Sequence, residues 1–157
     1  MNELIRTFVI EADNSFRQVI NTLLEEAVGI VIVGGAGNVT EALFLVGELE
    51  PDIILLDMEV LDWDKPSLLA QIQALSPGSK LIILSSPDEE HLVLDAFKQG
   101  AQGHLIKRQS QPSEIIEAIH VVNRGQAFLT PHIAGRVLDE MARQRRHGMK
   151  DSILDEG

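Results

Sequence analysis

The sequence predicts a single α/β domain built on an open, five-stranded parallel sheet. Two observations lead to this fold class: five short apolar runs that do not alternate with polar residues, and stretches of helical periodicity between them. Unbroken apolar runs of this length are typical of strands buried on both faces. Strict alternation of strands and helices favours right-handed crossovers, which place helices on both faces of a doubly wound sheet. The 157 residues suit one domain and are too few for a closed eight-fold barrel.

The predicted strands are the apolar runs themselves, in which most residues are β-branched or leucine. The five runs are Thr7–Ile10, Ile30–Val33, Ile53–Leu56, Leu81–Leu84 and His104–Ile106.

A helix is predicted after each strand, because apolar residues recur there every three or four positions. Asp13 or Asn14 can cap the first helix, Pro51 ends the second, and Gly100 follows the fourth, which spans about 88–99. The other apolar stripes are Phe16, Val19, Ile20, Leu23 and Leu24; Ala42, Leu43, Val46 and Leu49; Leu68, Leu69, Ile72 and Leu75; and Ile115, Ile116, Ile119 and Val122.

A sixth helical segment, from Pro131 to about Arg146, falls outside this repeat. Thr130 and Pro131 form a good cap and first-turn pair. Residues 136–150 hold five basic and two acidic residues, a net charge of +3, whereas residues 1–135 carry a net charge of −11. This shift in composition predicts a boundary near residue 128, with a main domain over 1–128 and a helical linker or extension over 129–157.

The overall charge excludes several partners for the main domain. With 24 acidic and 13 basic residues the net charge is −11, which argues against direct binding of nucleic acid or an anionic membrane. The chain has no cysteine, which suits the cytosol and excludes disulfides and thiolate metal sites. We therefore expect a cytoplasmic protein with no membrane contact.

Polar residues follow the predicted strands at the point where each strand ends. Glu11 follows the first strand, Asp57 the third, Ser85 the fourth and Lys107 the fifth. The carboxyl ends of parallel strands meet at one edge of the sheet, where ligands bind in open α/β folds. A carboxylate directly after a buried strand is costly unless a cation such as Lys107 or Mg2+ compensates it.

These residues resemble the receiver domains of two-component response regulators over roughly residues 5–128. The resemblance rests on the acidic residues after the first strand and on residues 51–58 (PDIILLDM), 84–86 (LSS) and 100–107 (GAQGHLIK). Residues 125–131 (GQAFLTP) are similar to the linker of LuxR-type transcriptional regulators. The resemblance implies a flavodoxin-like sheet in the order 2-1-3-4-5.

The resemblance also implies a role for each residue at the sheet edge. Asp57 would accept a phosphoryl group from a histidine kinase, and Lys107 would pair with that group. Glu11, Asp57 and the Glu59 backbone carbonyl would bind Mg2+, with Asp13 as a further candidate ligand. Ser85 and His104 would form the switch, in which the Ser85 hydroxyl binds the phosphoryl group and the His104 ring follows.

The resemblance further implies partners and an output. The protein would be a regulator rather than an enzyme, assisting only its own phosphotransfer and dephosphorylation. The segment after Thr130 would couple the receiver to a second copy, as a homodimer, or to an output domain. DNA contact would come only through a C-terminal helix-turn-helix domain, which this sequence does not contain.

Two departures from the family pattern affect these expectations. Ala12 stands where a second acidic residue is usual, so we expect Mg2+ binding to be weak. Arg108 replaces the proline that usually follows the lysine. A receiver-like interaction module that works without phosphate therefore remains the main alternative.

A dinucleotide-binding enzyme is a further alternative. Gly35 and Gly37 follow a strand and precede a helix, and Asp57 lies twenty residues after Gly37. However, Thr40 takes the place of the third glycine, and a full strand and helix precede the motif.

Overall fold

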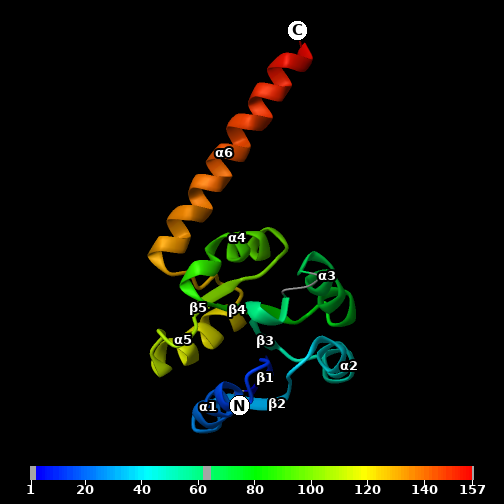
Figure 1. Cartoon of the computed structure of the whole chain (residues 1–157), viewed down its shortest axis with the longest axis vertical. Helices are drawn as coiled ribbons and strands as arrows, with labels where there is room; N and C mark the ends of the chain where they lie inside the picture. The colour runs from blue at the N-terminus through cyan, green and yellow to red at the C-terminus, as the bar shows by residue number, and fades with distance from the viewer. Residues whose placement is uncertain (1–2, 62–64, 157) are drawn as a thin grey trace.

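The computed structural model describes residues 3–61 and 65–156. Five parallel strands form one sheet in the order β2-β1-β3-β4-β5 (Figure 1), which confirms the predicted fold class and strand order. The elements are β1 (Ile5–Ile10), α1 (Asn14–Glu25), β2 (Ile30–Ala36), α2 (Val39–Leu49), β3 (Ile53–Asp57), η1 (Met58–Leu61), α3 (Lys65–Leu75), β4 (Lys80–Ser85), η2 (Pro87–Glu89), α4 (Glu90–Lys98), β5 (Gly103–Ile106), α5 (Pro112–Asn123) and α6 (Pro131–Glu156).

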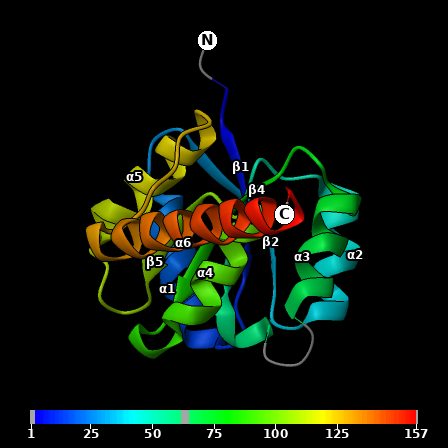
Figure 2. The ribbon, with the colours of Figure 1, turned by 90° about the horizontal axis from the view of Figure 1, so that it is seen from above.

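Helices cover both faces of the sheet (Figure 2), and each face has its own apolar core. Residues of α2, α3 and α4 pack in one core, and residues of α1 and α5 pack in the other. In β3, Ile54 and Leu56 belong to the first core, whereas Ile53 and Leu55 belong to the second. This burial on both faces explains the unbroken apolar run, and it carries Asp57 to the edge of the sheet on a fully buried strand.

The glycine pair Gly34-Gly35 lies inside β2 rather than in a loop. A Cβ atom at Gly34 would lie 3.1 Å from the Phe8 ring, and one at Gly35 would lie 3.1 Å from the Val9 carbonyl oxygen. Glycine therefore allows β2 to approach β1 closely, next to a register shift between Thr7 and Phe8. Packing between strands therefore accounts for Gly35, the first glycine of the dinucleotide-binding alternative, without a bound nucleotide.

The linker after α5 runs along the free edge of β5. Phe128 forms an isolated parallel bridge with Gly103; its carbonyl accepts from the His104 amide at 2.9 Å, and its amide donates to the Gln102 carbonyl at 3.1 Å. This short pairing covers an edge that would otherwise present unpaired backbone groups. The linker thus brings the start of α6 next to β5.

The C-terminal helix α6 begins as predicted and runs further than predicted. The Thr130 hydroxyl accepts from the Ile133 amide at 3.3 Å, as expected of a capping residue, and Ile133 is buried. The helix continues to Glu156 and extends away from the sheet and its covering helices (Figure 1). No helix in the described part of the chain combines the length and apolar character that crossing a lipid bilayer requires.

Candidate phosphorylation site

The carboxyl edge of the sheet brings the predicted polar residues together. Glu11 follows β1, Asp57 ends β3 and Lys107 follows β5. The Lys107 ammonium donates to Asp57 Oδ2 at 2.7 Å and to Glu11 Oε1 at 2.9 Å. All three residues are buried, so little water competes for these contacts.

The buried charges in this cluster shift the pKa of two members. Burial raises the pKa of Glu11 to about 7, and the adjacent Asp57 side chain adds to the rise while Lys107 opposes it. Burial lowers the pKa of Lys107, but its hydrogen bonds with Asp57 and Glu11 outweigh burial and leave the pKa raised. Lys107 is therefore charged at neutral pH, whereas Glu11 is partly protonated there.

Glu59 lies beside Asp57 in the first turn of η1. Its backbone amide donates to Asp57 Oδ1 at 3.0 Å, so each oxygen of the Asp57 carboxylate has one hydrogen-bond donor. The Glu59 side chain is half exposed and lies 3.9 Å from the Lys107 ammonium. These contacts fix the orientation of the Asp57 carboxylate at the end of its strand.

Asp13, the further candidate ligand, contacts other groups. Its Oδ1 accepts from the amides of Ser15 and Phe16 at the start of α1, and its Oδ2 pairs with Arg108 at 3.0 Å. The backbone hydrogen bond from Phe16 is the largest cause that lowers the pKa of Asp13. Asp13 was predicted from the sequence both as a cap of the first helix and as a candidate metal ligand. In the structure its side chain caps α1.

Ser85 and His104 face each other across neighbouring strands. Ser85 Oγ lies 2.7 Å from His104 Nε2, and both side chains are buried. Burial lowers the pKa of His104 to about 4, with the charge of Glu90 opposing, so the ring is neutral at pH 7. The predicted switch pair is therefore in direct contact.

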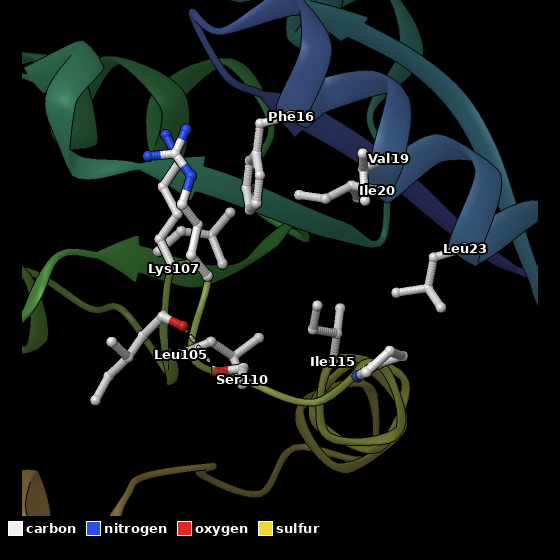
Figure 3. Close-up of a pocket in the computed structure, with 12 residues that line it drawn as sticks. Phe16, Val19, Ile20, Leu23, Leu105, Lys107, Ser110 and Ile115 are labelled. Carbon is white, nitrogen blue, oxygen red and sulfur yellow. Dashed lines mark hydrogen bonds between the residues drawn. The ribbon is translucent and has the colours of Figure 1, made fainter.

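Phe16 and Arg108 also contribute to the surroundings of Lys107, although the sequence analysis gave them no such role. The Lys107 ammonium lies 4.8 Å from the centre of the Phe16 ring, and the Arg108 guanidinium lies 5.5 Å from it. Phe16 also borders a groove of about 220 Å³ between α1 and the β5–α5 segment. Figure 3 shows Phe16, Ile20 and Ile115 around this mainly apolar groove, with Lys107 close by.

Comparison with known proteins identifies the family. The family model for the response regulator receiver domain matches residues 7–120. The chain belongs to this family. The receiver domain is 31% identical to the transcriptional regulatory protein YxjL of Bacillus subtilis over 140 residues, which are 89% of this chain and 62% of that protein. It is 28% identical to the nitrate/nitrite response regulator NarL of Escherichia coli K12, covering 78% of this chain and 56% of NarL. The chain thus spans somewhat less than two thirds of these two relatives.

Solved structures of receiver domains have the same fold. The signal receiver domain of NarL from Mycobacterium tuberculosis has a TM-score of 0.71 and 28% identity, covering 79% of this chain and 99% of that one. A LuxR-family response regulator from Aurantimonas sp. SI85-9A1 has a TM-score of 0.78 at 24% identity, covering 89% of this chain and 99% of that one. The structure from Aurantimonas therefore agrees in fold over a larger part of this chain than the NarL receiver does.

Receiver domains of this family generally bind Mg2+ at the phosphorylation site, and the donor atoms in this receiver fit such an ion. Glu11 Oε2 is a buried oxygen without a hydrogen-bond partner, and Asp57 supplies a second carboxylate next to it. Oxygen donors of this kind are what Mg2+ prefers. Within residues 3–61 and 65–156, however, no three His, Cys, Asp or Glu side chains gather into a metal site. Among the described residues, Glu11 and Asp57 therefore supply the two buried carboxylates of the site, and Ala12 adds none.

Proposed function

We propose that this receiver domain accepts a phosphoryl group on Asp57 from the phosphohistidine of a histidine kinase. The observation that carries the proposal is the buried Asp57 carboxylate, oriented by the Glu59 amide and paired with Lys107 at 2.7 Å. Phosphoryl transfer depends mainly on such positioning and on neutralisation of charge. An Asp57 oxygen would attack phosphorus and form an acyl phosphate, while the P–N bond breaks and its electron pair stays on the kinase imidazole.

The neighbouring residues have separate roles in this proposal. Lys107 pairs with the negative charge of the transferred group, and the Ser85 hydroxyl donates a hydrogen bond to a phosphoryl oxygen. Glu11, Asp57 and the Glu59 backbone carbonyl would hold Mg2+, and Asp13 is a ligand only if its side chain leaves the α1 cap and Arg108. When bound, Mg2+ supplies positive charge that neutralises the phosphoryl oxygens.

The output of the proposed switch is control of a partner, with no substrate turnover. Relatives such as YxjL, LiaR of Bacillus subtilis and NarL are regulators, two of them named as transcriptional. We infer a histidine kinase as the phosphodonor, a second copy of the receiver as a homodimer partner, and transcription as the regulated process. DNA would be bound by a separate helix-turn-helix domain, because the receiver itself is strongly acidic over residues 1–135.

Intact-mass spectrometry tests the phosphoacceptor. Incubation with acetyl phosphate and Mg2+ should add the mass of one phosphoryl group, and Asp57→Asn should abolish the addition. Asp52→Asn is a matched control, because Asp52 precedes the opposite end of β3 and accepts from the Arg6 amide. Labelling that persists in Asp57→Asn would refute the assignment. An unlabelled wild-type chain would favour the interaction module that works without phosphate.

A further inference from the structure

Glu90, in the first turn of α4, connects the main domain to α6. Its Oε2 lies 2.8 Å from His132 Nε2, and its Oε1 lies 2.8 Å from Arg136 Nε. Each carboxylate oxygen therefore contacts one side chain from the first two turns of α6. A third ion pair, between Lys98 and Glu140 at 3.1 Å, lies further along the same two helices.

A cavity of about 210 Å³ joins Glu90 to the switch pair. Its lining includes Ser85 from the end of β4, His104 from β5 and Glu90 from α4. Thr130, just before α6, and His132 and Ile133 in its first turn line the other side. Ser85 and His104, the switch pair, thus border the same half-open pocket as the base of α6.

His104 is incompletely hydrogen-bonded in this space. Its side chain is 2% exposed, Nε2 is bonded to Ser85, and Nδ1 has no partner. If the Ser85 hydroxyl turns to a phosphoryl group on Asp57, the ring loses the one side-chain hydrogen bond it has. A buried imidazole with no partner is unfavourable, because its polar atoms have also lost contact with water.

We propose that Glu90 is a positioning residue that couples phosphorylation of Asp57 to α6. Once Ser85 binds the phosphoryl group, His104 turns within the cavity and donates its ring N–H to Glu90. To reach the ring, the Glu90 side chain turns away from His132 and Arg136, and the first turns of α6 separate from α4. This inference rests on the proposed function, since it begins with the Ser85 hydroxyl binding a phosphoryl group.

The contacts that would break are weak enough for such an exchange. His132 and Arg136 are largely exposed, and exposed ion pairs contribute little to stability. The new bond would join the buried His104 ring to a carboxylate that is 28% exposed, and a hydrogen bond to a charged acceptor is stronger than one between neutral groups. Glu90 is therefore the acceptor for which the buried ring and α6 compete.

Hydrogen–deuterium exchange of the full chain tests the coupling, with the phosphorylated fraction measured by intact mass in the same samples. In the wild type, acetyl phosphate and Mg2+ should raise amide exchange in residues 134–141 about fivefold, the factor expected for loss of two exposed ion pairs. Glu90→Gln should show this faster exchange without phosphate and gain little from phosphorylation. His104→Phe keeps a ring of similar size but has no N–H, so it should become phosphorylated without any change in α6.

The matched control is Glu140→Gln, which removes the Lys98 pair and leaves Glu90 intact. This variant should keep the phosphorylation-dependent change in exchange. The coupling through Glu90 is refuted if phosphorylated His104→Phe shows the wild-type change, or if Glu90→Gln exchanges like the wild type without phosphate. A wild-type chain that gains no phosphoryl mass overturns the proposed function and this inference together. A fully labelled wild-type chain in which exchange of α6 does not change refutes this inference alone, and the mass measurement distinguishes the two cases.

Discussion

Ala12 leaves the candidate phosphorylation site without the carboxylate that an acidic residue would supply at this position. Ala12 is exposed and Asp13 pairs with Arg108, so among the described residues the carboxylates within hydrogen-bond distance of Lys107 are those of Glu11 and Asp57. Burial and the adjacent Asp57 raise the pKa of Glu11 to about 7, so Glu11 is partly protonated at neutral pH. A bound divalent cation would have to displace a proton from Glu11, which weakens binding as the pH falls.

Adding a carboxylate at position 12 should strengthen the metal site. We expect Ala12→Asp to tighten Mg2+ binding roughly tenfold, because each added charged oxygen ligand compensates more of the dehydration cost of Mg2+. Phosphorylation of Asp57 by acetyl phosphate should be faster in the same variant. Titration of Mg2+ and the time course of intact mass measure the two effects, with Ala12→Asn as the uncharged control. Equal affinities for Mg2+ in wild type and Ala12→Asp would show that other ligands already complete the site.

Asp13→Asn tests whether Asp13 is one of those ligands. Asparagine keeps an oxygen that can cap α1, so the helix should remain stable while the negative charge is lost. Because Asp13 pairs with Arg108 and caps α1 in this structure, we expect the Mg2+ affinity to stay within twofold of wild type. A much weaker affinity in this variant would show that Asp13 turns toward the metal when Mg2+ binds.

His104 should make the stability of the domain depend on pH. Burial lowers its pKa from 6.5 to about 4, so the unfolded chain takes up a proton at a higher pH than the folded chain does. Stability from this group is complete above pH 6.5 and is lost as the pH falls toward 4. Between pH 7.5 and pH 5.5 the loss should be about 1 kcal/mol.

Denaturant unfolding of wild type and His104→Phe at both pH values isolates this contribution. The comparison is needed because Glu11, whose pKa is raised to about 7, has the opposite effect: it contributes stability below pH 4.5 that is lost as the pH rises toward 7. Subtracting His104→Phe removes the Glu11 contribution, which both proteins share. The same pH dependence in both proteins would argue against a buried neutral His104.

At the scale of elements, α6 differs between its two ends. Ile133 is 3% exposed and packs at the base of the helix, whereas Leu138 and Met141 are 65% and 59% exposed. From residue 141 to 148 every side chain is exposed. Most of the stability of a helix in a protein comes from packing of one face, so only the first turns of α6 are stabilised by the rest of the domain.

Two substitutions and one deletion test this division of α6. Ile133→Ala should lower the free energy of unfolding by about 3 kcal/mol, because it leaves a cavity where the helix packs. Leu138→Ala, on the same helix, should change it by less than about 0.5 kcal/mol. Removal of residues 142–157 should likewise leave the thermal midpoint unchanged. A large loss of stability on that deletion would mean that the distal part of α6 packs against another surface in solution.

The sequence predicted elements well where a single periodicity determined the outcome. The run Ile53–Leu56 is apolar throughout because its residues alternate between two cores, and the position of Asp57 follows directly from it. The second strand was predicted to end at Val33 but continues to Ala36, because Gly34 and Gly35 allow close packing on Phe8 and Val9. Glycine usually interrupts a strand, so its role here depends on a neighbour that the local pattern does not show.

The site residues show the same limit. The convergence of Glu11, Asp57 and Lys107 was predictable because parallel strands share one edge. The contacts of Glu90 were not, because they join α4 to residues of α6 that lie 42 and 46 positions away in the sequence and are solvent-exposed there. No sequence periodicity or motif predicts an exposed ion pair between residues so far apart in the chain.

At the scale of the whole molecule, a ligand at the carboxyl edge should stabilise the entire fold. The groups that would contact it come from the ends of four strands: Glu11 after β1, Asp57 and Ser85 at the ends of β3 and β4, and Lys107 after β5. Unfolding separates these groups, so a phosphoryl analogue has affinity for the folded state alone. Beryllofluoride with Mg2+ is such an analogue of the phosphorylated carboxylate.

We expect beryllofluoride and Mg2+ to raise the melting temperature by about 5–10 °C at a ligand concentration one hundred times the dissociation constant. The gain in stability is then about 2.7 kcal/mol, and in a domain of this size each kcal/mol raises the midpoint by about 2–4 °C. Asp57→Asn should show no shift, since beryllium needs the carboxylate oxygen, and Ala12→Asp should reach the same shift at a lower Mg2+ concentration. Differential scanning calorimetry with and without the ligand measures the change in each protein. An equal shift in melting temperature in wild type and Asp57→Asn would show that the ligand binds elsewhere on the molecule. The gain in stability would then not depend on the carboxylate at the end of β3.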